Sequence, residues 1–180
     1  MQFKSITLAL VGATSLMAHP FAEQAASDLV ELDRKPASDG KGTLLFLGLG
    51  GEEKRADAGL LPVEERATCQ SSATPSCSGK NTARNDICDQ LVSELYGDAS
   101  VSVGQSPRQI CYQGAAAESN DYCCVSWHDK VPGLTKGDLA PFAQGILSQC
   151  TSNGISGKTY NVLVHNTCTS VCLSNRGTGC

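Results

Sequence analysis

No cysteine occurs in the first 68 residues of this 180-residue chain, although the remainder contains ten. The sequence also has no C-x-x-C pair, which zinc sites commonly use, and no G-x-S-x-G element of the kind that presents a nucleophilic serine. These absences disfavour zinc chelation and serine hydrolase chemistry. We therefore expect neither a metal ion nor a cofactor.

Clustered positive charge is also missing. The whole chain carries 14 basic and 18 acidic residues, for a formal net charge of −4, and from Cys69 onward 7 basic residues stand against 8 acidic ones. Proteins that bind nucleic acids concentrate Lys and Arg to neutralise phosphates. The composition therefore argues against a nucleic-acid partner.

The chain begins with an apolar run that is too short for a transmembrane helix, which needs about 20 residues. The run covers residues 5–18, follows Lys4 and ends in Ala18. A basic start, a short apolar core and a small residue at the cleavage site are typical of a secretory signal peptide. The alternative interpretations of this run are a buried core helix or a membrane anchor. We predict a signal peptide over residues 1–18, cleavage after Ala18, and a secreted, extracellular protein without a transmembrane segment.

Residues 19–55 are predicted to be a pro-segment that is removed. A turn-like stretch at 39–42 precedes an apolar run at 43–50, and the dibasic pair Lys54 and Arg55 follows. Such a pair in an acidic stretch resembles the sites cut by Kex-type processing proteases, although it is otherwise an ordinary surface pair. The apolar run then either covers an apolar face during folding or acts as a spacer.

A disulfide-bonded domain is predicted over residues 69–180. A flexible lead at 56–68 precedes it, and Arg66 in this lead is a second candidate cleavage site. In a small secreted domain, an even number of cysteines predicts a disulfide framework. Ten cysteines allow five bridges, and the sequence leaves their pairing open. The expected disulfide cysteines are Cys69, Cys77, Cys88, Cys111, Cys123, Cys124, Cys150, Cys168, Cys172 and Cys180.

Apolar spacing in this domain predicts two helices. Ile87, Leu91 and Leu95 recur at four-residue steps, and a second apolar stripe follows Asp138, which we expect to cap its helix. Strands are predicted over residues 108–112, 122–127 and 160–164, with a short fourth at 169–173. Two helices that each carry one apolar stripe bury those stripes by packing against a sheet. The predicted fold is α+β: a small disulfide-rich two-layer α/β sandwich, with two helices on a mainly antiparallel three- to four-stranded sheet.

Cys123 and Cys124 are adjacent in one of these strands. Successive strand side chains point to opposite faces of a sheet. One cysteine is therefore expected to bridge toward the helices and the other toward the outer face or a loop. Cys88 and Cys150, which lie on the helix stripes, are the partners considered for the inward one.

Acid/base catalysis is the main enzymatic alternative. A small secreted ribonuclease needs two proton-transfer groups and a phosphate-binding arginine. His128, His165 and Arg108, with Glu94 or Glu118, meet that requirement if they converge. Otherwise His128 and His165 are surface residues near strand ends. Trp127, the single tryptophan, is expected to be a core residue or a half-buried anchor, and the alternative is a platform on which a ligand stacks.

Several stretches of the domain resemble the fungal secreted domain called WD-like, over roughly residues 69–180. A more distant similarity of layout links the chain to the α/β-sandwich killer toxins of smut fungi. The resemblance implies a fungal secretory context and carries over no catalytic residues. The stretches are Asn85-Asp86-Ile87-Cys88-Asp89, Pro107-Arg108-Gln109-Ile110-Cys111, Cys123-Cys124-Val125-Ser126-Trp127 and Gly154-Ile155-Ser156-Gly157.

The predicted function is non-catalytic binding outside the cell, by a small cysteine-rich fungal protein of the effector or toxin-like kind. Its partner is an extracellular protein, a glycan or a membrane, and the protein is expected to be a monomer. The loops at 114–121 and 129–137 are expected to carry specificity, because a rigid scaffold leaves recognition to its loops. The alternatives are a ribonuclease-like hydrolase that uses His128 and His165, and a cell-wall or surface structural protein.

Overall fold

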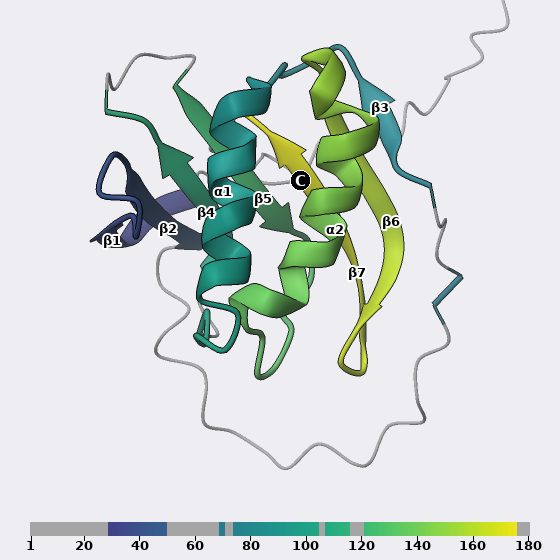
Figure 1. Cartoon of the computed structure of the whole chain (residues 1–180). Coiled ribbons are helices and arrows are strands. Elements are labelled where there is room, and N and C mark those ends of the chain that lie inside the picture. Colours follow the sequence, from purple (N-terminus) through teal and green to yellow (C-terminus); the bar gives the residue numbers. More distant parts are fainter. Residues whose placement is uncertain (1–28, 50–68, 71–73, 105–106, 116–120, 176–180) are drawn as a thin grey trace, which may run out of the picture.

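One antiparallel sheet dominates the chain, and both helices cover the same face of it (Figure 1). The computed structural model describes residues 29–49, 69–70, 74–104, 107–115 and 121–175. Within these residues the sheet has seven strands, in the spatial order β1-β2-β4-β5-β7-β6-β3. The elements are β1 (Leu29–Pro36), β2 (Thr43–Leu49), β3 (Ser76–Ser78), α1 (Asn85–Gly97), β4 (Pro107–Gln113), β5 (Tyr122–Trp127), α2 (Lys136–Gln149), a 3₁₀ turn (Thr151–Asn153), β6 (Ser156–Val164) and β7 (Thr167–Ser174).

The prediction of a three- to four-stranded sheet is wrong. Strands β1 and β2 come from the segment expected to be a pro-segment, and β3 comes from a stretch rich in Ser. The apolar run in β2 does not alternate because both faces of this strand are covered. Leu44 and Phe46 lie in the core beneath the helices, whereas Leu45 and Leu47 pack on the opposite face. A strand that is buried on both faces reads as a continuous apolar run.

The two helices form where the apolar stripes predict them, with one difference at a cap. The α1 stripe of Ile87, Leu91 and Leu95 is buried. Helix α2 is capped by Thr135 and not by Asp138. Asp138 is the third residue of that helix, and its carboxylate accepts hydrogen bonds from the Thr135 backbone N–H at 2.8 Å and the Thr135 hydroxyl at 2.7 Å. This reciprocal arrangement is a capping box, in which both residues satisfy free N–H groups.

Disulfides tie the helices and strands of the described chain together. Cys123 bonds Cys88 on the helix side of the sheet, and the adjacent Cys124 bonds Cys111 of β4 on the opposite face, which matches the expected opposite orientation of the pair. Two further bridges join distant segments, and Cys172 is disulfide-bonded to a partner outside the described residues. The further bridges are Cys77–Cys150 and Cys69–Cys168.

The main core fills the space between the sheet and the two helices. Trp127 contributes to it with 2% of its surface exposed, so it is a core residue. Among the described residues, no helix has the length and apolar character needed to cross a membrane.

Candidate functional site

The residues considered for acid/base catalysis have separate partners. His128 is exposed, and its Nδ1 lies 3.1 Å from Asp129 Oδ1. His165 places Nε2 3.1 Å from Asp138 Oδ2 and Nδ1 2.9 Å from the Pro132 carbonyl oxygen. Each imidazole is therefore held by a different carboxylate, and His165 ties the β6–β7 turn to the start of α2.

The other residues of the ribonuclease hypothesis also have distinct surroundings. Arg108 is buried in β4, with one guanidinium N–H donating to the Pro107 carbonyl oxygen at 3.1 Å. Glu94 is buried on α1 and accepts hydrogen bonds from the turn between β1 and β2. Glu118 lies outside the described residues. Each of the described groups is therefore bonded to a different neighbour, and none of these contacts joins two of them.

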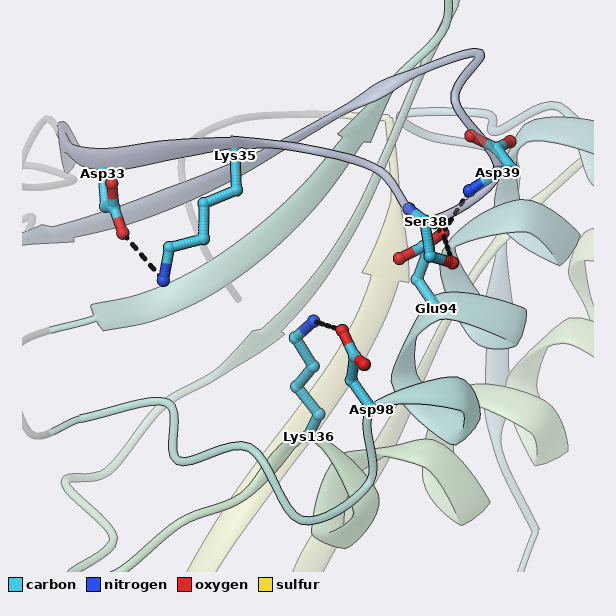
Figure 2. Close-up of polar contacts among 7 residues, drawn as sticks. All are labelled: Asp33, Lys35, Ser38, Asp39, Glu94, Asp98 and Lys136. Carbon is cyan, nitrogen blue, oxygen red and sulfur yellow. Dashed lines mark hydrogen bonds and ion pairs between the residues drawn. The ribbon is translucent and has the colours of Figure 1, made fainter.

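A further ion pair joins a buried ammonium to a half-exposed carboxylate. Lys136, the first residue of α2, is only 3% exposed, and its ammonium lies 2.9 Å from Asp98 Oδ2. Asp98 is the C-cap of α1. Asp98 lies one helical turn beyond Glu94, and its N–H donates to the Glu94 carbonyl oxygen at 3.3 Å, so this ion pair and the Ser38–Glu94 contact both lie at the end of α1 (Figure 2). The pair links the end of α1 to the start of α2.

A polar hollow lies where β3, β6 and β7 meet, and it is the strongest candidate site in the described chain. Lys158 and Cys172 are register partners in β6 and β7, and they alternate with Val171 and Leu173, which enter the core beneath the helices. The hollow therefore opens on the sheet face opposite the helices. It encloses about 230 Å³ and is lined by Ser76, Ser78, Lys80, Asn81, Ser156, Gly157, Lys158, Tyr160, Cys172 and Ser174.

An irregularity in β6 presents an aromatic ring at this hollow. The β6–β7 register shifts between Thr159 and Val162, and Asn161 in between has a φ of 52°, in the left-handed region. A β-bulge of this kind re-aims the neighbouring side chains. Tyr160 is 45% exposed, and the Lys158 ammonium lies 4.8 Å from the centre of its ring.

The rest of the hollow is fixed by bonds to its neighbours. The Ser156 hydroxyl lies 3.1 Å from the Ser78 carbonyl oxygen and 2.6 Å from the Lys80 carbonyl oxygen, so it holds the chain that leaves β3. The Cys77–Cys150 bridge anchors β3 to the end of α2. The walls are therefore ordered before any ligand arrives, which lowers the entropic cost of binding.

Within the described chain, one hydroxyl of the hollow has no hydrogen-bond partner and two of its ammonium groups have no carboxylate partner. Ser174 is 5% exposed, and its hydroxyl has no hydrogen-bond partner there. A buried hydroxyl without a partner is costly, and such a group in a binding site is satisfied by the ligand or by water. The Lys80 and Lys158 ammonium groups also lack a carboxylate partner among the described residues.

No described residue of the loops expected to carry specificity lines this hollow. Residues 116–120 of the first loop lie outside the described residues. The second loop, at 129–137, is pinned: Val131 and Leu134 are buried, and the Val103 N–H donates to the Leu134 carbonyl oxygen at 2.9 Å. The sequence carries a signal for part of the hollow in the polar residues of β6. It carries none for β3, because the pairing of β3 with β6 joins residues about 80 positions apart.

Metal coordination has no support in the described part of the chain, which contains no group of three or more His, Cys, Asp or Glu residues able to hold an ion. The candidate site therefore offers hydroxyls, ammonium groups and one aromatic face. Such a set binds a polar, oxygen-rich ligand through hydrogen bonds and charge, with the ring contacting an apolar part of it.

Comparison with protein families matches residues 58–180 to the fungal WD-like family. The match begins three residues after Arg55, so it includes β3 to β7 and both helices but leaves out β1 and β2. No curated protein and no solved structure matches the chain.

Proposed function

The chain belongs to the fungal WD-like family, and from this premise we propose that it is a secreted small cysteine-rich protein that acts outside the cell by binding, without catalysis, as an effector or toxin-like protein. The disulfides support a secretory route, because such bridges persist in oxidising compartments. The apolar run at residues 5–18 supports the same route as a signal peptide.

The hollow at β3, β6 and β7 carries the proposal, and its central observation is the Ser174 hydroxyl, which has no hydrogen-bond partner within the described residues. Its ligand is a glycan with acidic groups. Sugar rings present hydroxyls for Ser174 and its polar neighbours and an apolar C–H face for Tyr160. Carboxylates on the sugar pair with Lys80 and Lys158, which have no carboxylate partner among the described residues.

Titration of the purified, oxidised protein with oligogalacturonate, with neutral glucan and chitin oligomers in parallel, tests the proposal. We expect binding to the acidic oligomer, weakened by salt because exposed charges are screened. Tyr160→Ala should weaken it about three- to tenfold, the scale of one aromatic contact. Tyr96→Ala is the matched control, because Tyr96 is similarly exposed, at 51%, but lies on α1.

The outcomes separate the competing functions. Equal effects of Tyr160→Ala and Tyr96→Ala, or no glycan binding by the folded protein, would contradict the proposed site. Release of cleaved RNA or sugar that is lost in His128→Ala or His165→Ala would establish a hydrolase instead. Binding confined to polysaccharide from the producing fungus would favour a cell-wall protein.

A further inference from the structure

The hairpin of β1 and β2, residues 29–49, is part of the sheet although it precedes the expected cleavage site. Strand β2 pairs with β4 from Thr43 opposite Gln113 to Gly48 opposite Pro107. Strand β1 pairs only with β2 and forms the edge of the sheet; the hairpin of both strands lies at the left of Figure 1. The contact with the rest of the protein therefore runs mainly through β2 and the turn that precedes it, and Leu29 of β1 also packs against the cluster that includes Cys111 and Cys124.

Strand β2 contacts both faces of the sheet. On the helix side, Leu44 and Phe46 are 2% and 5% exposed and belong to the main core. On the other side, Leu45 and Leu47 pack with the Cys111–Cys124 disulfide. The β4 edge therefore accepts an extended strand whose large apolar side chains fit both layers at once.

The turn between β1 and β2 is bonded to α1. Glu94 Oε1 accepts hydrogen bonds from the Ser38 N–H at 2.8 Å, the Ser38 hydroxyl at 2.6 Å and the Asp39 N–H at 3.4 Å (Figure 2). The Tyr112 hydroxyl of β4 donates to Asp39 Oδ2 at 2.6 Å. An added Cβ on Gly42 would lie 2.2 Å from the Tyr112 ring, so the turn packs closely against β4.

None of these contacts is covalent, since no cysteine precedes Cys69. A cut between Arg55 and Ala56 leaves the hairpin attached only by its packing and hydrogen bonds. We infer that residues 29–49 stay bound to β4 and α1 after this cut, so that the secreted protein is a two-chain complex and the pro-segment is a permanent strand donor. The inference rests on processing at Lys54 and Arg55 and is independent of the glycan site.

The test starts from the folded, oxidised protein that begins at residue 19. A Kex-type protease is added to it, and the product is analysed by native size exclusion with intact mass measurement. A second form, with a site-specific protease sequence inserted after Arg55, yields the same pieces whether or not the dibasic site is used. Failure of processing is thereby distinguished from failure of retention.

We expect the peptide to co-elute with the domain at about one to one, and to separate in denaturant without reductant. Phe46→Ala should weaken retention by on the order of a hundredfold or more, the scale of truncating a buried aromatic side chain. Val30→Ala is the matched control because Val30 is 44% exposed on β1, and it should retain the peptide. Glu94→Gln gives a second loss-of-contact variant if Phe46→Ala does not fold.

Separate elution of the peptide under native conditions would overturn the inference, whether the remaining domain stays folded or aggregates. Equal retention in Phe46→Ala, Glu94→Gln and Val30→Ala would also overturn it, because the described contacts would then not be what holds the hairpin.

Discussion

Gly157 in β6 allows the sheet to approach α2, and an added methyl group has no room there. A Cβ at this position would lie 2.5 Å from Ile146 Cγ2, 2.8 Å from Cys150 Sγ and 3.1 Å from Cys150 Cβ. Cys150 is held by its bridge to Cys77, and Ile146 is fully buried, so neither neighbour moves away easily. Overpacking of this kind costs about 1–3 kcal/mol.

Gly157→Ala should therefore lower the free energy of unfolding by about 1–3 kcal/mol, measured by urea denaturation with the disulfides intact. Gly145→Ala is the matched control, because a Cβ there meets no atom within 4 Å and Gly145 lies inside α2. That change should stabilise the protein by about 0.5–1 kcal/mol, since alanine is the better helix former. A Gly157→Ala protein as stable as the parent would refute the packing described between β6 and α2.

Two further predictions concern charged groups. Asp98→Ala should destabilise the protein by about 1–3 kcal/mol, because it leaves the buried Lys136 ammonium without its carboxylate. Lys136→Met should change the free energy of unfolding by less than about 1 kcal/mol, because it removes the buried charge together with its need for a partner. Equal losses of stability in the two variants on thermal denaturation would contradict this prediction. The hydrogen bond from Tyr112 holds the pKa of Asp39 below its usual 3.8, with help from two backbone N–H groups and against desolvation. A carboxyl whose folded-state pKa is lowered stabilises the fold above its unfolded pKa and loses that contribution as pH falls through the folded value. Unfolding of the parent should therefore show a steeper loss of stability below about pH 4 than unfolding of Asp39→Asn, and parallel curves would contradict it.

Local patterns predicted the helices and most strands of the family-matched region correctly. The apolar stripe of Ile87, Leu91 and Leu95 marks α1, and the opposite orientation of Cys123 and Cys124 follows from the alternation along a strand. The cap of α2 was misplaced by three residues, because Thr135 and Asp138 form one reciprocal motif in which either residue type is a good cap.

The size of the sheet was underestimated for a physical reason. Residues 43–49 carry the composition of a strand buried on both faces, but whether such a run joins the sheet depends on partners far away in sequence, here β4 more than 60 residues later. The hollow could not be predicted for the same reason, because it forms only where β3 pairs with β6, which is far away in sequence. Sequence patterns report local periodicity, and both features depend on which distant strands become neighbours.

NMR chemical-shift mapping of the full protein, during titration with the acidic oligosaccharide, would locate the bound glycan on the protein surface. We expect shifts confined to the hollow, at Ser76, Lys158, Tyr160 and Ser174. Shifts centred on the loops at 114–121 and 129–137, with Tyr160 and Ser174 unchanged, would contradict the proposed site.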